Sequence, residues 1–390
     1  MGKPEIRFKG YTDEWEQRKL GDVAQEFKSG NSLKADEIDI TGDYPVYGGN
    51  GLRGYTSTYN HDGEYALIGR QGALCGNMNY SAGKAYFTEH AVVVKADENN
   101  VTRFLYYMLD TMNLGQYSDQ SAQPGLAVNK LVKLENSFPK KEEQQQIGAY
   151  FRSLDHLITL HQRKCDEVKS LKKYMLQKMF PQNEQKVPEI RFEGFTEAWE
   201  QRKLGDVLDD MYNGQTPSRN KSEYWNGNIK WLSSGELNRG TVYDSMEMIT
   251  EDGQKSANLR IVPKGTFIMA ITGLEAAGTR GNCALLGFDT TLNQSCMALF
   301  PKKDLLTSDF LFQWYRKVGE EYGINYTQGT KQQSYNAELI KILPISLPSV
   351  AEQRKIASYL SNLDHLITLH QQKCEELKKI KKFMLQKMFV

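Results

Sequence analysis

Cysteine is scarce in this sequence, and the few cysteines are far apart. No C-x-x-C pair occurs among the five, which are Cys75, Cys165, Cys283, Cys296 and Cys374. An odd number with such spacing argues against a disulfide framework and against a zinc knuckle. We therefore expect reduced thiols.

Long hydrophobic runs are also missing. No stretch approaches the ~18 apolar residues of a membrane-spanning helix, and the N-terminus lacks the apolar segment of a signal peptide. With 390 residues, of which 39% are hydrophobic, the chain should fold into two or more domains. We expect a cytoplasmic protein with no membrane partner.

A strong excess of positive charge is absent too, since the formal net charge is +1. Lysine plus arginine against aspartate plus glutamate gives 15 against 18 in residues 1–140 and 18 against 21 in residues 181–348. The basic excess lies in residues 141–180 and 349–390, with 8 against 5 and 8 against 4. A protein that binds DNA unaided usually has a stronger basic footprint, so DNA binding by this chain would need a partner.

What the sequence does have is an internal repeat. Residues 4–23 match residues 188–207 at 16 of 20 positions, and residues 143–180 match residues 352–389 at 25 of 38. The offsets are 184 and 209, so the middle of the second copy is 25 residues longer. We call these four segments the frame, and the regions between them, roughly 24–140 and 208–348, the inserts.

The two inserts show no alignment that can be defended, although the frame segments align clearly. This contrast is expected if the frame does one job twice while each insert faces a different partner surface. The alternative is drift of duplicated domains wherever nothing constrained them, which would spread the divergence over frame and insert alike.

Each copy of the frame ends in a predicted long helix. Its apolar residues recur at alternating steps of four and three, which is a heptad seam, from Ile147 to Val168 and from Ile356 to Leu377. At Lys172 the seam meets a charge, and a shifted stripe that begins at Leu171 is expected to take over. Each helix should run about 38 residues, or ~57 Å.

A lone helix of this kind would expose its seam, so the two helices should pair. We favour an antiparallel pair with one insert at either end, which would place the inserts ~50 Å apart, the span of a dozen or more base pairs at ~3.4 Å each. The alternative is that the helices mediate homodimerisation.

Histidine and cysteine lie four residues apart on each helix, as His161 and Cys165 and as His370 and Cys374. An antiparallel crossing near mid-helix would bring all four together in a possible zinc geometry. Such residues at seam positions are more often packed against neighbours. No metal is assigned, and the sequence leaves open whether these four residues bind one.

Both inserts should be mixed domains with considerable strand content. In the first, short β-prone runs such as residues 65–68 and 91–94 alternate with glycine-rich turns. Its turns carry Asn50, Arg53 and other side chains suited to base edges and phosphates, although ordinary polar turns remain the alternative. The second insert has aromatic residues among polar ones, of which Trp225 and Trp231 are expected in the core.

Catalytic motifs are not found. Residues 273–280 have the glycine spacing of a P-loop, but Thr279 and Arg280 stand where Lys and Ser/Thr are needed. H-E-x-x-H, G-x-S-x-G, a Rossmann fingerprint and the Asn/Asp-Pro-Pro-Tyr/Phe tetrapeptide of adenine methyltransferases are also missing. We expect a chain that recognises a target and is not an enzyme.

These residues resemble the specificity subunit of type I restriction-modification systems. The resemblance covers essentially the whole chain and includes Trp-x-x-x-x-Leu-Gly-Asp-Val before each insert, from Trp15 and Trp199, and Leu-Asp-x-x-Ile in each helix. Residues 44–51 and 68–73 of the first insert, and 214–219 and 231–237 of the second, are similar to recurrent variants of the family's target recognition domains.

The resemblance implies an α+β fold in which a pair of long antiparallel coiled-coil helices separates two mixed α/β target recognition domains, related by a pseudo-two-fold repeat. The implied order is a first target recognition domain at 1–140, a first spacer helix at 141–182, a second domain at 183–348 and a second spacer helix at 349–390.

The implied function is recognition of a bipartite double-stranded DNA target, one half by each domain, with the helices setting the gap. Two methyltransferase subunits would bind the frame and two restriction/translocase subunits would complete the complex. S-adenosylmethionine, ATP and Mg would bind to those partners, and this chain would bind no cofactor. The hypothetical DNA contacts are Tyr47, Asn50, Arg53, Arg70, Gln71, Gln123, Arg219, Lys230, Ser234, Glu236, Arg280, Lys331 and Gln332.

Two other classes stay open. A stand-alone DNA-binding module such as a repressor would bind tightly without partners and show a steep salt dependence by itself. An enzyme with an unrecognised site would cleave or methylate DNA as the isolated chain. The sequence does not give the target bases, the gap length or the surface that binds the methyltransferase.

Overall fold

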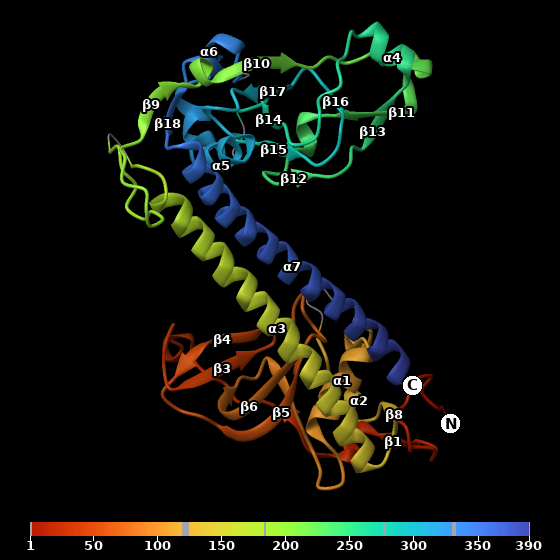
Figure 1. Ribbon diagram of the computed structural model, residues 1–390. Coiled ribbons are helices and arrows are strands. Elements are labelled where there is room, and N and C mark those ends of the chain that lie inside the picture. The colour runs from red at the N-terminus through yellow and green to blue at the C-terminus, as the bar shows by residue number, and fades with distance from the viewer. Residues whose placement is uncertain (1, 119–124, 183–184, 276–277, 330–332, 390) are drawn as a thin grey trace. The chain divides into compact units, whose positions relative to one another are not determined.

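The computed structural model describes residues 2–118, 125–182, 185–275, 278–329 and 333–389. The chain forms two compact units, each with its own hydrophobic core (Figure 1). Unit 1 comprises residues 1–163 and 370–390, and unit 2 comprises residues 164–369. Each unit thus contains one insert, the first part of one long helix and the last part of the other.

Unit 1 is built on a six-stranded sheet with the order β2-β7-β5-β6-β3-β4. A two-stranded ribbon, in which β1 of the frame pairs with β8 of the insert, and the helices α1 and α2 accompany this sheet (Figure 1). The bounds are β1 Glu16–Lys19, β2 Ala24–Ser29, β3 Tyr44–Gly48, β4 Gly51–Thr56, β5 His61–Gly69, β6 Met78–Phe87, β7 Ala91–Ala96, α1 Thr102–Thr111, α2 Val128–Leu131 and β8 Glu135–Phe138.

The predicted strands of the first insert are confirmed in β5 and β7. Residues Ala91 to Val94 of β7 form a buried apolar run because both faces of the strand are covered there. Val92 and Val94 lie in the main core of unit 1, while Val93 packs with Leu67 and Phe87 in a second cluster on the opposite face.

Unit 2 has a five-stranded sheet, β10-β17-β14-β15-β12, and a small sheet, β13-β11-β16. The ribbon of β9 and β18 and the helix α5 correspond to elements of unit 1 (Figure 1). The bounds are β9 Glu200–Lys203, β10 Leu208–Asn213, β11 Trp225–Leu232, β12 Thr241–Val242, β13 Glu247–Ile249, α4 Glu251–Ser256, β14 Phe267–Ala270, β15 Cys283–Leu286, β16 Thr291–Leu292, β17 Cys296–Pro301, α5 Ser308–Asn325, α6 Ala337–Lys341 and β18 Pro344–Leu347.

The two inserts share one plan, which their sequences conceal. The order β2-β7-β5-β6 in unit 1 has its counterpart in β10-β17-β14-β15 in unit 2. In both units a helix, a short helix and a ribbon strand then follow in the same order. A buried sheet requires apolar side chains of suitable volume but not particular ones, so a common sheet survives without alignable residues.

The two long helices are α3, Lys141–Lys178, and α7, Val350–Met388. In unit 1 the pair is antiparallel, because Asp155 contacts Lys381 while His161 contacts His370 further along. In unit 2 the pair is also antiparallel, because the Cys165 Sγ lies 3.9 Å from the Ile367 carbonyl oxygen while Lys172, further along α3, bonds Asp364. The predicted α+β fold with paired antiparallel helices is confirmed.

The repeated frame closes each unit by the same contacts. Arg7 forms a bidentate ion pair with Glu143 at 2.6 and 2.7 Å, and Arg191 forms the equivalent pair with Glu352 at 2.7 and 2.8 Å. The Ile190 amide donates to the Lys178 carbonyl at the end of α3, as the amide of Ile6 does to that of Lys387 in α7. The two copies of the frame therefore make equivalent contacts through residues that the repeat shares.

The seam of unit 2 continues through Lys172, which is 4% exposed, whereas Leu171 is 43% exposed. The predicted shift of the stripe onto Leu171 is therefore wrong. The Lys172 ammonium bonds Asp364, whose other oxygen accepts from the Arg316 guanidinium at 2.6 Å. Burial, together with the nearby charge of Arg316, lowers the pKa of Lys172 from 10.5 to about 8.

Lys172→Met should stabilise unit 2 and remove a pH dependence. Between pH ~8 and ~10.5 the unfolded chain binds a proton that the folded chain lacks, so wild-type stability should rise with pH over this window. The substitution would end that rise and add about 1 kcal/mol near pH 7.5, since Asp364 keeps Arg316. Urea unfolding at pH 7.5 and 9.5 measures both effects.

The repeat supplies the matched control, Lys381→Met in unit 1. Lys381 bonds Asp155 at 2.6 Å, and Asp155 also accepts from the Tyr107 hydroxyl at 2.7 Å, where unit 2 has Arg316. This carboxylate would keep a hydroxyl but lose its cation, so we expect a loss of about 1 kcal/mol. Equal behaviour of the two variants would show that Arg316 does not decide the outcome.

Candidate nucleic-acid interface

The predicted DNA contacts of unit 1 converge where the β3–β4 turn meets the end of β5. The backbone segments come this close together because glycine has no side chain. A β-carbon on Gly49 would lie 2.9 Å from the His90 carbonyl oxygen, and one on Gly69 would lie 2.4 Å from the Gly49 carbonyl oxygen. We call this area site 1.

The side chains at site 1 differ in exposure. Asn50, Arg53 and Gln71 are exposed, whereas Tyr47 is half-buried against Phe87, with ring centroids 6.0 Å apart. Arg70 is half-buried, and its backbone amide donates to the His90 carbonyl at 2.9 Å. The structure therefore brings Tyr47, Asn50, Arg53, Arg70 and Gln71 into one area, and Gln123 lies outside the described residues.

Two further residues at site 1 were not predicted. The His90 Nδ1 lies 3.2 Å from the Gln71 Oε1, so its imidazole belongs to the same surface. Leu52 is 53% exposed between Asn50 and Arg53. No sequence motif singles out His90, because only the turn between β6 and β7 brings it beside Gln71.

In unit 2 the predicted residue Arg219 is already engaged. Its guanidinium forms a bidentate pair with Glu247 at 2.5 and 2.9 Å and lies 3.8 Å from the Trp225 ring centroid. Hydrogen bonding to Glu247 raises the pKa of Arg219. As predicted, Trp231 is in the core, at 2% exposure, but Trp225 is only partly buried, because it lies at the edge beneath Arg219.

Glu236 and Lys230 lie close to the turn of residues 243–246, between β12 and β13. One carboxylate oxygen of Glu236 accepts from the amide and hydroxyl of Ser233, both at 2.9 Å, and the other accepts from the Met246 amide at 2.7 Å. The Lys230 ammonium pairs with Asp244. We call these residues, with Arg219 and the half-buried Ser234, site 2.

Arg280 lies in a separate loop that Arg239 braces. Arg239 has a left-handed backbone, with φ at +60°, and its guanidinium donates to the Gly278 and Arg280 carbonyls at 3.2 and 2.5 Å. Arg280 in turn donates to the Gln333 Oε1 at 3.2 Å. Neither Arg239 nor Gln333 was predicted, while Lys331 and Gln332 lie outside the described residues.

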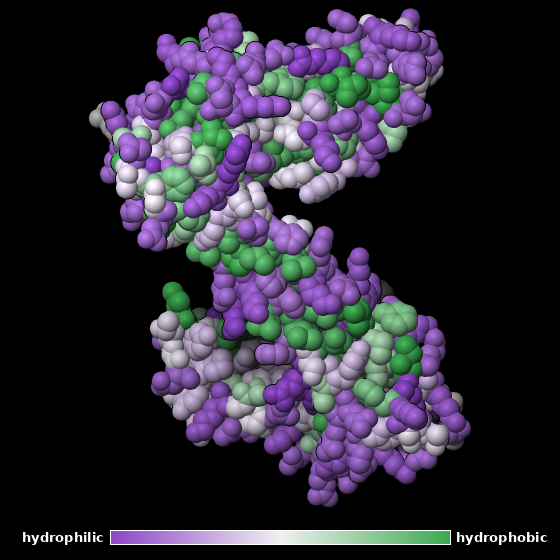
Figure 2. Space-filling view, viewed as in Figure 1, coloured by the Kyte–Doolittle hydropathy of each residue, from purple (hydrophilic) through white to green (hydrophobic). Residues whose placement is uncertain are grey.

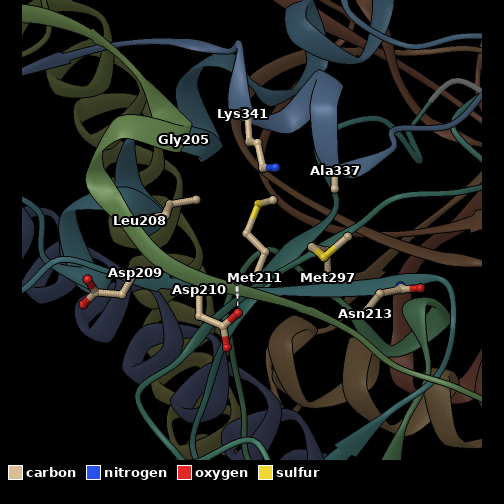
Figure 3. Close-up of a pocket in the computed structure, with 9 residues that line it drawn as sticks. All are labelled: Gly205, Leu208, Asp209, Asp210, Met211, Asn213, Met297, Ala337 and Lys341. Carbon is tan, nitrogen blue, oxygen red and sulfur yellow. Dashed lines mark hydrogen bonds between the residues drawn. The ribbon is translucent and has the colours of Figure 1, made fainter.

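A pocket of about 410 Å³ opens in unit 2 between β10, β17 and α6. The nine residues that line it include two methionines, Met211 and Met297, and the charged Asp209, Asp210 and Lys341 (Figure 3). Ser, Cys and His are missing from this lining, so it holds no Ser–His or Cys–His pair. Asp210 is bonded instead to the Arg260 guanidinium at 2.6 Å.

The long helices expose apolar side chains at equivalent positions of the two copies. Leu157 of α3 is 39% exposed and its counterpart Leu366 of α7 is 40% exposed, while Tyr174 and Phe383 are 47% and 50% exposed. Figure 2 shows apolar patches over these helices. These exposures recur in the second copy because the repeat places the same kinds of residue at equivalent positions of the two helices.

The histidines and cysteines of the seam are engaged within their own units. The Nδ1 atoms of His161 and His370 lie 3.0 Å apart, and the Cys374 Sγ lies 4.0 Å from the Ile158 carbonyl oxygen. Within the described part of the chain, His, Cys, Asp and Glu form no group of three or more suited to a metal. Over the same residues, no helix is long and apolar enough to cross a membrane.

Comparison with known proteins gives matches over both copies of the repeat. The model of the type I restriction modification DNA specificity domain matches residues 12–170 and 196–379. The EcoprrI specificity subunit of Escherichia coli is 42% identical over 156 residues, which is 39% of each chain. A putative type I restriction enzyme specificity subunit of Haemophilus influenzae is 26% identical over 364 residues, 90% of this chain and 88% of that one.

The matched part of the sequence covers about two fifths of the EcoprrI subunit and of the MjaIX specificity subunit of Methanocaldococcus jannaschii, which is 33% identical over 186 residues. A crystal structure of the S subunit of a type I restriction-modification system from M. genitalium has the same fold, with a TM-score of 0.73 at 15% identity over 100% of this chain and 99% of that one. The family model covers most of the sequence and both repeats. The chain therefore belongs to the type I restriction-modification DNA specificity family.

Proposed function

We propose that this chain is the DNA-recognition subunit of a type I restriction-modification complex and that each unit recognises one half of a bipartite target. The observation that carries the proposal is that the two units share one sheet and one repeated frame, while their loops differ. One scaffold that presents two unlike loop sets is suited to two unlike half-sites.

The polar loops of sites 1 and 2 supply the recognition surface. Arg53, Asn50 and Gln71 offer exposed donors and acceptors of the kinds that bind guanine and adenine edges in the major groove. At site 2 the cations Arg219 and Lys230 are paired with carboxylates, so their partners reduce the local positive charge. Because these cations are paired, we expect the isolated chain to bind DNA weakly.

Partner subunits supply the remaining functions. Two methyltransferase subunits bring S-adenosylmethionine, and two restriction/translocase subunits bring the ATP and Mg chemistry, while this chain performs no catalytic step. The methyltransferase subunits dock on the frame, where Leu157 and Leu366 give equivalent apolar positions. The neutral balance of the chain, +1 overall, fits a subunit whose partners provide phosphate contacts.

Exchange of one insert tests the proposal. The chain is co-expressed with its cognate methyltransferase, and methylation of random-sequence DNA is mapped base by base. Replacing residues 24–140 by the insert of another family member should change one half of a split motif and leave the other half and the gap unchanged. The reciprocal exchange of residues 208–348 is the matched control and should change the other half.

Other outcomes would contradict the proposal. A motif that is not split, or methylation that does not depend on this chain, would favour a stand-alone DNA-binding module. Cleavage or methylation by the isolated chain would show an enzyme instead.

A further inference from the structure

The turn of residues 243–246 in unit 2 presents an apolar tip. Met246 is 89% exposed and Tyr243 is 78% exposed, and among the described residues of unit 2 these are the two most exposed large hydrophobic side chains. Single exposed apolar residues are common on protein surfaces, so exposure alone assigns no role. What distinguishes this turn is how its backbone is fixed and what surrounds it.

Three side chains fix the backbone of the turn. The Met246 amide donates to the Glu236 carboxylate at 2.7 Å, the Ser245 amide donates to the Asp244 Oδ1 at 2.9 Å, and the Ser245 hydroxyl donates to the Glu247 carbonyl at 2.8 Å. The same Glu236 carboxylate caps residues 233–236. Met246 is thus presented on a pre-organised loop, which reduces the entropy lost on binding.

Close packing also positions Tyr243. A β-carbon on Gly287 would lie 2.6 Å from the Tyr243 Cδ1, so the ring lies directly over this glycine. Lys230 pairs with Asp244 of the same turn, and Arg219 pairs with Glu247 immediately after it. The apolar tip therefore stands between two ion pairs, whose polar groups lie beside it.

DNA offers one apolar feature in its major groove, the 5-methyl group of thymine, and proteins contact it with apolar side chains. We propose that Met246 contacts the methyl group of a thymine in the half-site that unit 2 recognises. The proposal rests on the proposed function of unit 2, and it adds which base is contacted, through which group, and by which side chain. The flexible thioether side chain can adapt to the methyl group while Glu236 fixes its backbone.

Deoxyuridine provides the test, because it lacks only this methyl group. The full complex with its methyltransferase subunits is bound to duplexes that carry its own target, and each thymine of the second half-site is replaced singly by deoxyuridine. At one position the wild-type affinity should fall about fourfold, the effect of one buried methyl group. Met246→Ala should lose about the same factor on the thymine duplex and little more on the deoxyuridine duplex.

Two variants serve as controls. Met246→Leu keeps an apolar side chain and should keep the sensitivity to deoxyuridine. Ile324→Ala removes an apolar side chain that is 57% exposed at the end of α5, and it should behave like the wild type on both duplexes.

The proposal is overturned if the second half-site has no thymine, if no substitution weakens wild-type binding, or if Met246→Ala remains as sensitive as the wild type. In each of these three outcomes the complex still binds its bipartite target specifically. Loss of bipartite specificity altogether would instead contradict the proposed function, so the two failures can be told apart.

Discussion

Arg191→Ala should lower the free energy of unfolding of unit 2 by about 3–5 kcal/mol, because it leaves a carboxylate buried without its cation. Glu352 is 1% exposed, and both of its oxygens accept from the Arg191 guanidinium. Thermal unfolding should show a melting temperature that is roughly 10 °C lower. Arg7→Ala should do the same to unit 1, where Glu143 is also 1% exposed.

Two controls separate burial from the loss of an arginine. Arg202→Ala breaks the pair of Arg202 with Glu200 on the surface, where the side chains are 39% and 67% exposed, and it should cost less than about 1 kcal/mol. The double change Arg191→Met with Glu352→Met removes both charges and should recover most of the loss. A double variant as unstable as Arg191→Ala would show that the pair itself stabilises unit 2.

Gly214→Ala should destabilise unit 2 by about 3 kcal/mol or more, since the added methyl group would meet backbone that cannot move cheaply. A β-carbon on Gly214 would lie 2.0 Å from the Leu292 carbonyl oxygen and 2.5 Å from that of Asn293. Gly30, at the repeat offset of 184, has the same constraint, with the Phe87 carbonyl oxygen at 2.3 Å. Urea unfolding followed by tryptophan fluorescence measures the loss.

Gly235→Ala is the matched control. The nearest atom to a β-carbon there is the Ser233 Oγ at 3.8 Å, so the change should be neutral or slightly stabilising. If Gly214→Ala and Gly235→Ala unfold at the same urea concentration, the backbone at Leu292 and Asn293 must move away from residue 214 at little cost, against this prediction.

Gly30 and Gly214 are equivalent in the structure, although the residues around them differ too much for sequence comparison to align them. Both glycines follow the first strand of the insert, β2 or β10, at the point where it passes the strand beside it. They lie only a few residues beyond the frame, yet the neighbouring residues differ. The sheet constrains volume and polarity, so glycine recurs where backbones touch and little else is shared in identity.

The sequence predicted which polar residues lie in the loops of the candidate interface, but not which of them are bonded within the protein. Arg53 and Asn50 lie in a glycine-rich hairpin, which the sequence indicates, and both are exposed. Glu236 also lies in a predicted loop, but its carboxylate bonds the Ser233 and Met246 amides. A polar residue in a loop can face a ligand or stabilise the loop, and only its bonding partners distinguish the two roles.

The sequence by itself determined the repeat, the two long helices and their seam, because heptad spacing and near-identical segments are local properties of the chain. Only the tertiary structure decided that each unit combines parts of both helices, that the unlike inserts share one sheet, and that Lys172 stays in the seam beside Asp364. These features depend on contacts between residues far apart in sequence, where packing and charge pairing override the local pattern.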